Sequence, residues 1–171
     1  ENKNLVFHTP SSDLDLNLVT TAGKLWNEEV EEAIEEGNLI HSLLSLVKSK
    51  NDIDFAISWH VDNGFIKQEK EDFYLSLLKS ISTHPDLADF FAEGNIVWME
   101  RDIYFQNQLL RPDRVNFKEK EAFIIDYKTG IASNQHVNQI NEYSKALSSL
   151  KYNVKKSLLV YITDSIEVKI V

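Results

Sequence analysis

The pattern of hydrophobic and polar positions divides the chain into a helical half and a strand-rich half. Over residues 21–47, apolar side chains recur at intervals of three or four residues, or sums of these, which predicts one long helix with a buried stripe. The stripe consists of Trp26, Val30, Ile34, His41 and Leu44. Further helices are expected over residues 55–63, 67–82 and 86–91. We expect these helices to cover a sheet, with His60 and His84 at the surface.

The second half of the chain predicts a sheet with one helix inserted into it. Strands are expected at residues 96–105, 107–117, 122–128, 157–162 and 166–171, and a helix at 134–150. This order predicts an α/β sandwich, in which a central mixed β-sheet is flanked by helices and the functional site lies on one sheet edge. Residues 1–20 are polar and lack periodicity, so we expect an extended lead-in from a preceding domain, followed by a single domain at 21–171.

Charged side chains occupy the end of the predicted strand at residues 122–128. Because strand side chains alternate between faces, Asp126 and Lys128 should share one face, with Tyr127 on the other. An Asp and a Lys at this spacing are also typical of a solvated ion pair at the end of an exposed strand. The spacing of these two residues therefore leaves a structural and a catalytic interpretation open.

A second carboxylate strengthens the catalytic interpretation. If the polar segment 118–121 forms a hairpin turn, Val115 lies opposite Ile124 and Asp113 lies opposite Asp126, with Cβ atoms about 5 Å apart. Two carboxylates this close repel each other unless a cation lies between them. Mg²⁺ prefers oxygen ligands and keeps waters that can act as nucleophiles. Such a pair, with a lysine to orient the water or to stabilise charge on a phosphate, suits metal-dependent phosphodiester cleavage.

Two predicted helices supply further candidates, each with an ordinary alternative. His41 lies on the apolar stripe of the first helix, where it could be a core histidine or an imidazole ligand for a metal. Gly37 lies one turn earlier and lowers helix propensity by about 1 kcal/mol relative to alanine, which a closely approaching partner would explain. Gln139 and Tyr143 are four residues apart, so they project side by side, either at the core edge or toward a substrate.

Several ordered motifs resemble one nuclease family. Residues 110–115 (LRPDRV), 123–130 (FIIDYKTG) and 139–143 (QINEY) are similar to the RecB-type nuclease domain of the PD-(D/E)xK superfamily. Residues 36–44 (EGNLIHSLL) resemble the helical G-x-x-x-H-x-x-L element of that family, and 98–100 (WME) resemble a strand that supplies another acidic residue. Many members have a glycine where this chain has Leu110, but the literal Pro-Asp that names the superfamily is present at residues 112–113.

The resemblance implies a restriction-endonuclease-like fold and a set of roles. The implied catalytic residues are Asp113, Asp126, Lys128 and Glu100. The implied metal ligands for Mg²⁺ or Mn²⁺ are His41, Asp113, Asp126 and the backbone carbonyl of Tyr127. Gln139 and Tyr143 are implied to bind substrate. The resemblance further implies a DNA nuclease, expected to be an exonuclease. It would act on a single strand or an unwound duplex end with helicase domains of the same polypeptide or a partner subunit, in double-strand-break repair and recombination.

Composition limits these expectations. The chain has no cysteine, which excludes the four-cysteine iron–sulfur cluster found in some relatives of this nuclease group. Its net charge of −9 argues against strong autonomous DNA binding, although much of the excess falls on one helix face that we expect to be solvated. The glutamates of that face are Glu28, Glu29, Glu31, Glu32, Glu35 and Glu36. A helicase that delivers the strand would reduce the need for intrinsic affinity.

Two alternatives belong to other functional classes. One is a catalytically inactive nuclease-like scaffold or DNA-binding module of a helicase complex. The other is a protein-interaction domain whose acidic helix docks a basic partner, which would bind no divalent metal at Asp113 and Asp126. The sequence contains no apolar run long enough to span a bilayer and no signal peptide, so we expect no membrane partner and a cytoplasmic location.

Overall fold

The computed structural model describes residues 21–171, and side chains from Val30 onward. The extended lead-in expected for residues 1–20 lies outside this part. The chain divides into an N-terminal unit that ends at Ala33 and a compact unit from Ile34 to Val171, and helix α1 (Thr21–Leu46) contributes to both. The sheet and the candidate site belong to the second unit.

The helical half agrees with the apolar periodicity, with small differences at the ends of elements. After α1 come α2 (Ile53–Asp62) and α3 (Glu71–Thr83). Three short 3₁₀ turns accompany them: η1 (Lys50–Asp52), η2 (Gln68–Lys70) and η3 (Ala88–Phe91). The helix predicted at 67–82 therefore begins later, and the short helix predicted at 86–91 is a 3₁₀ turn. Such single turns are common where a helix begins and in connections between elements.

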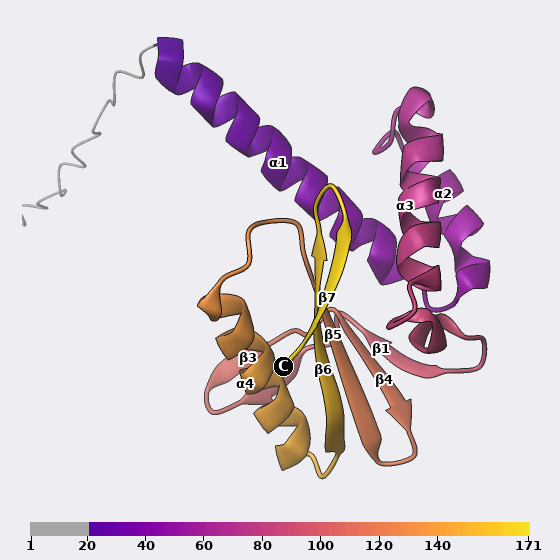
Figure 1. Cartoon of the computed structure of the whole chain (residues 1–171), viewed down its shortest axis with the longest axis vertical. Helices are drawn as coiled ribbons and strands as arrows, with labels where there is room; N and C mark the ends of the chain where they lie inside the picture. The colour runs from indigo at the N-terminus through magenta and orange to yellow at the C-terminus, as the bar shows by residue number, and fades with distance from the viewer. Residues whose placement is uncertain (1–20) are drawn as a thin grey trace, which may run out of the picture. The chain divides into compact units, whose positions relative to one another are not determined.

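The strand-rich half forms a five-stranded sheet in the order β1-β4-β5-β6-β7 (Figure 1). Its strands are β1 (Ile96–Met99), β4 (Arg114–Lys118), β5 (Glu121–Lys128), β6 (Asn153–Ile162) and β7 (Ile166–Ile170). Strands β5 and β6 are parallel, and the other neighbours are antiparallel. Helix α4 (Asn134–Ser149) makes the crossover that a parallel pair requires. The predicted fold class, an α/β fold with a mixed sheet between helices, is confirmed.

Two of the predicted strands are wrong, because each one is interrupted. The strand expected at 96–105 breaks at Glu100, whose φ of 44° lies in the left-handed region. The strand expected at 107–117 breaks around Pro112, which has no N–H to donate to a ladder. The outer pieces, β2 (Ile103–Phe105) and β3 (Gln108–Leu110), pair with each other as a separate two-stranded ribbon.

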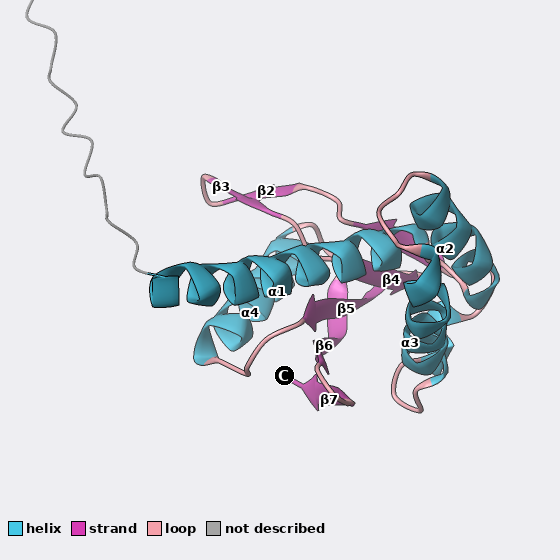
Figure 2. Ribbon diagram, turned by 90° about the horizontal axis from the view of Figure 1, so that it is seen from above, coloured by secondary structure: helices cyan, strands magenta, loops and turns pink. Residues whose placement is uncertain are grey.

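Alternate side chains of the central strands contribute to two separate cores. Figure 2 shows α4 and α3 on opposite sides of β5 and β6. On one face, Ile125 and Tyr127 of β5 pack with apolar residues of α1, α2 and α3. On the other face, Ile124 packs with the buried side of α4 and with Ile103 of the ribbon. The period-two prediction for β5 is therefore confirmed: Tyr127 lies on the face opposite to Asp126 and Lys128.

Burial corrects two other expectations. The apolar stripe of α1 is buried only from Gly37 onward, whereas Val30 and Ile34 are 48% and 56% exposed. Periodicity predicts the apolar face of a helix, but not how much of its length meets a partner. His60 is buried rather than at the surface, because its Nε2 lies 2.8 Å from Ser42 Oγ and its Nδ1 lies 2.8 Å from the Ala56 carbonyl oxygen. Within residues 21–171, no helix has the length and apolar character needed to cross a bilayer.

Candidate functional site

The hairpin between β4 and β5 brings the two predicted aspartates to adjacent strand ends. Val115 pairs with Ile124 as expected, and the last pair of the β4–β5 ladder is Arg114 with Ile125. One further step places Asp113 opposite Asp126. The Asp113 Oδ2 accepts a hydrogen bond of 2.7 Å from the Tyr127 backbone N–H, which ties the two strand ends together. The expectation of a site on a sheet edge is wrong, because the α4 crossover adds β6 and β7 beyond β5 and makes β5 the central strand.

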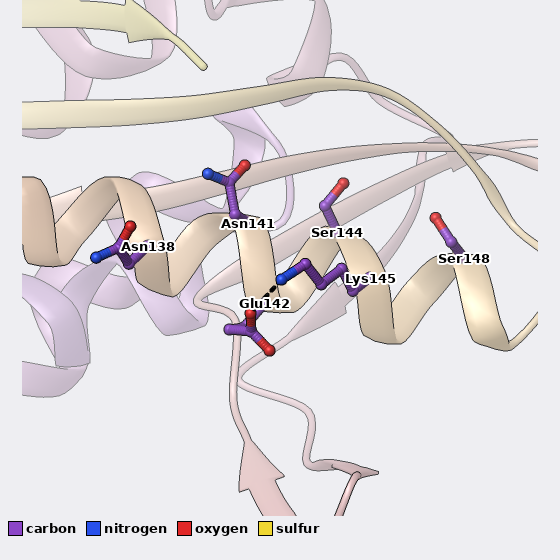
Figure 3. A pocket seen from close by; sticks show the side chains of 6 residues that line it. All are labelled: Asn138, Asn141, Glu142, Ser144, Lys145 and Ser148. Atoms are coloured by element: carbon purple, nitrogen blue, oxygen red, sulfur yellow. Dashed lines mark hydrogen bonds and ion pairs between the residues drawn. The ribbon is translucent and has the colours of Figure 1, made fainter.

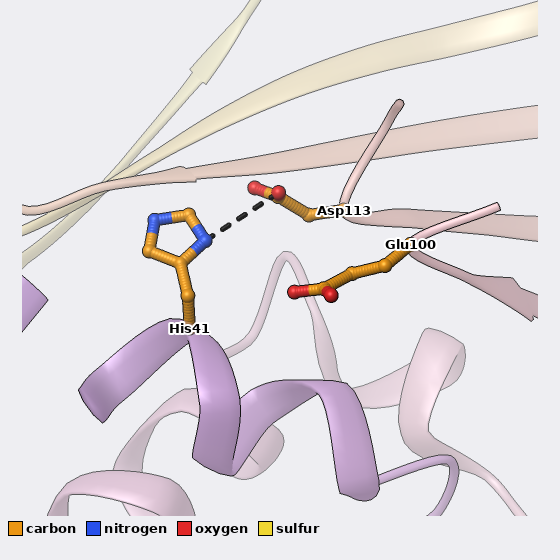
Figure 4. Close-up of side chains that lie close together, drawn as sticks. All are labelled: His41, Glu100 and Asp113. Atoms are coloured by element: carbon orange, nitrogen blue, oxygen red, sulfur yellow. Dashed lines mark ion pairs between the residues drawn. The ribbon is translucent and has the colours of Figure 1, made fainter. Parts of the chain in front are cut away.

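Three side chains from separate elements converge beside these strand ends (Figure 4). His41 comes from α1, Glu100 follows β1, and Asp113 precedes β4. One potential ligand atom from each lies within 4.8 Å of the other two. His41 Nδ1 is 3.4 Å from Asp113 Oδ1, and the Glu100 N–H donates to the Asp113 carbonyl oxygen at 2.9 Å. The left-handed backbone at Glu100 thus turns the chain out of β1 next to Asp113.

The chemistry of this group suits a hard divalent cation. Two carboxylates and one imidazole form an oxygen-rich donor set that Mg²⁺ tolerates and Mn²⁺ accepts readily. The hydrogen bond to Asp113 raises the pKa of His41, and burial opposes that rise. His41 and Asp113 are only partly buried, with 30% and 16% of their side chains exposed, so solvent can reach the group. The sequence suggested each of these residues separately, and the folded chain brings them within reach of one ion.

Asp126 lies outside this three-residue group. Its side chain is buried and its Oδ2 lies 2.6 Å from Lys128 Nζ. That contact is an ion pair without hydrogen-bond geometry, since Oδ2 has no hydrogen-bond partner among the described residues. Burial is the main cause that raises the pKa of Asp126 to about 6, the negative charge of Asp113 adds to the rise, and Lys128 opposes it. An additional positive charge would stabilise the ionised form of a carboxylate in this position, so the residues present fit a bound cation.

Lys128 begins a chain of polar contacts that continues onto α4. Its Nζ donates to Gln139 Oε1 at 2.9 Å, and Gln139 Nε2 donates to the Tyr143 hydroxyl at 2.7 Å. Burial, followed by the charges of Asp126 and Asp113, raises the pKa of Tyr143, so its hydroxyl keeps its proton. The predicted side-by-side arrangement of Gln139 and Tyr143 is present, and both residues face Lys128 rather than solvent alone.

Tyr127 serves the site through its backbone. Its side chain is buried on the opposite face of the sheet, where its ring lies edge-on to the His41 ring at a centroid separation of 6.4 Å. Its N–H is the group that holds Asp113. Metal ligation by its carbonyl oxygen stays a prediction.

Arg114 is a supporting residue that sequence reasoning missed. It is fully buried and donates to the carbonyl oxygens of Val47, Lys48 and Phe90. These contacts attach β4, directly after Asp113, to the chain just beyond the end of α1. Arg114 therefore maintains the placement of His41 relative to Asp113. A charged residue at an inward-facing position of a strand was the available signal, because such a charge must find buried partners.

The close approach predicted at Gly37 is also confirmed. A Cβ atom on Gly37 would lie 2.6 Å from Thr129 Oγ1, immediately after Lys128. The glycine thus lets α1 pack against the end of β5, one turn before His41.

A shallow polar depression on α4 lies apart from these residues (Figure 3). It is lined by Asn138, Asn141, Glu142, Ser144, Lys145 and Ser148. None of the predicted site residues lines it, and it holds an ordinary surface ion pair between Lys145 and Glu142. We therefore place the candidate site at the strand ends instead.

Comparisons with known proteins add little to this geometry. No family model matches the chain, and no curated protein matches it. One matching solved structure, described as "Crystal structure of SSO0001", shares 16% sequence identity over 88% of this chain and 79% of that one, with a TM-score of 0.32. At this TM-score the similarity carries no information about function.

Proposed function

We propose that this chain is a metal-dependent deoxyribonuclease domain that hydrolyses phosphodiester bonds at the ends of DNA strands. The observation that carries the proposal is the register of β4 and β5, which sets Asp113 opposite Asp126 and puts Lys128 on the same face as Asp126. The approach of His41 and Glu100 to Asp113 supports it. The resemblance of the ordered motifs to RecB-type nuclease domains supplies the reaction class.

Two groups of residues would perform different parts of the hydrolysis. His41, Glu100 and Asp113 would hold Mg²⁺ or Mn²⁺, with Asp126 beside them, and a bound ion there supplies Lewis-acid stabilisation and a water of lowered pKa. Lys128 carries a compact positive charge between Asp126 and Gln139, where it can orient a water and stabilise negative charge on a phosphate. Gln139 and Tyr143 offer an amide and a hydroxyl to the bound strand.

The acidic character of the chain favours substrate delivery by another protein. With a net charge of −9, the domain has little general attraction for a phosphate backbone. Glu31, Glu32, Glu35 and Glu36 of α1 are all exposed. We therefore propose that helicase domains, on the same polypeptide or on a partner subunit, supply a single strand or an unwound duplex end during double-strand-break repair and recombination.

The test is degradation of end-labelled single- and double-stranded DNA with Mg²⁺ or Mn²⁺, comparing the native chain with Lys128→Ala. We expect cleavage by the native chain and at least a 100-fold loss in the variant. Lys145→Ala is the matched control, because Lys145 is a surface lysine on α4 and should leave the rate unchanged.

Calorimetry of Mn²⁺ binding separates the remaining outcomes. Metal binding that is lost in Asp113→Asn, without cleavage by the native chain, would indicate a module that needs its helicase. The absence of both cleavage and metal binding would refute the catalytic proposal and favour a scaffold or a protein-interaction domain.

A further inference from the structure

A histidine outside the recognised motifs lies beside the proposed site. His136 is in the first turn of α4, three residues before Gln139 and seven before Tyr143. Positions three and seven residues apart share one side of an α-helix, so His136 extends the row of polar residues that begins at Tyr143. Lys128 donates to Gln139 in the middle of this row. His136 is half-buried, so its ring is both held by the protein and accessible to solvent.

A tyrosine on the neighbouring strand holds the His136 ring. The Tyr161 hydroxyl lies 3.3 Å from His136 Nδ1, and the two rings are tilted against each other at a centroid separation of 5.8 Å. Tyr161 of β6 is the direct partner of Lys128 in the parallel ladder, so both project from the same face of the sheet. His136 and Lys128 are thus both neighbours of Tyr161.

The His136 ring can offer a neutral N–H donor to a ligand. The first turn of α4 contains no acidic residue, and Lys128 is the nearest charge that affects His136. Burial and then the positive charge of Lys128 lower the pKa of His136, so the ring is neutral at neutral pH. The Tyr161 hydroxyl can donate to Nδ1 of the neutral ring or accept from it. When it donates, the ring proton lies on Nε2, and no described residue hydrogen-bonds to that nitrogen.

We propose that His136 is a substrate-binding residue, whose Nε2–H donates to a phosphate of the DNA strand next to the phosphate bound at Lys128. The proposal rests on the proposed nuclease function and extends its binding site by one nucleotide along α4. The spacing is suitable, because three residues, about 4.5 Å along the helix axis, separate His136 from Gln139, which contacts Lys128. Tyr161 is a positioning residue, since its hydroxyl and its ring both contact the His136 ring.

Two opposed substitutions distinguish this role from simple packing. His136→Phe keeps a ring against Tyr161 but removes the N–H, whereas His136→Gln keeps an N–H donor but removes the ring. A phosphate contact predicts weaker DNA binding by the Phe variant and near-native binding by the Gln variant. A packing role predicts the opposite order, with the Gln variant also less stable in thermal unfolding.

Binding can be measured without cleavage in the Asp113→Asn background. We would titrate a fluorescein-labelled dodecathymidylate at low salt with Mg²⁺ and record anisotropy, with Lys145→Ala as the surface control. His136→Phe should raise the dissociation constant about 10-fold or more, the size of one lost hydrogen bond to a charged group, and Tyr161→Phe should raise it about 2-fold. Lys145→Ala should change it less than 2-fold.

The outcomes separate this inference from the nuclease proposal. Native-like binding by His136→Phe, or no detectable binding by any variant, would overturn the role of His136. This holds even if the native chain cleaves DNA. Weaker binding by His136→Phe and rescue by His136→Gln would support the role. That result would stand even if the native chain proved catalytically inactive.

Discussion

Replacement of Arg114 by methionine should destabilise the domain far more than an ordinary arginine substitution. The guanidinium is fully buried, lies 4.2 Å over the Phe91 ring and donates to three backbone carbonyl oxygens and to Asn116 Oδ1. Hydrophobic replacement of a buried ion pair can be neutral, because both charges are removed together. Here the acceptors are backbone carbonyls, which no substitution can remove.

The expected loss follows from the number of acceptors left without a donor. Each buried acceptor that loses its partner costs about 1–3 kcal/mol. Water can replace the donor at Lys48, which is exposed, and the Phe90 carbonyl keeps Asn116 Nδ2 as a donor. The buried Val47 carbonyl and Asn116 Oδ1 lose the donor that Arg114 supplies. Removing the desolvated charge of Arg114 offsets part of the loss. We therefore expect about 3 kcal/mol, out of a total stability of about 5–15 kcal/mol for a typical domain.

Urea denaturation in metal-free buffer measures this loss. With a slope of about 2 kcal/mol per molar urea, the midpoint should fall by about 1.5 M while the slope stays constant. Arg111→Met is the matched control: Arg111 is exposed and pairs with exposed Asp102 at 2.6 Å, so the urea midpoint should stay almost unchanged. A loss below 1 kcal/mol in Arg114→Met would refute the reasoning that its carbonyl contacts hold β4 to the end of α1.

Two further predictions concern the neighbours of the site. Gly37→Ala should lower the free energy of unfolding, measured by urea denaturation, by about 1 kcal/mol, because strain against Thr129 outweighs the gain in helix propensity. In a Thr129→Ala background the same change should stabilise the domain. Stabilisation in the native background would contradict the close approach. Asp126→Asn should raise stability at pH 7 without metal by about 1–3 kcal/mol. The folded-state pKa of Asp126 is raised to about 6, so its protonated carboxyl contributes to the stability of the folded chain. That contribution is complete below the ordinary pKa of 3.8 and is lost as pH rises through 6. The stability difference between variant and native chain should therefore grow from pH 4 to pH 7, and a constant difference would be the contrary result.

Local patterns predicted those features that depend on neighbouring residues in the chain. The polar turn between β4 and β5 set the pairing of Val115 with Ile124, because a short hairpin leaves little freedom of register. Alternation along β5 then placed Asp126 and Lys128 together, and helical spacing did the same for Gln139 and Tyr143. These geometries follow from the periods of strands and helices, so they need no information about distant parts of the chain.

Long-range packing determined which of these local features meet. The contact between His41 and Asp113 joins positions 72 residues apart in the sequence, and it depends on Gly37 and Arg114 holding α1 against the sheet. Helical periodicity placed His41 on a face but could not identify its partner. The separation of Asp126 from the ligand group likewise depends on its contact with Lys128 inside a buried environment. Burial, charge and contact are properties of the assembled layers, and they bring His136 into contact with Tyr161, the ladder partner of Lys128, although no motif marked either residue.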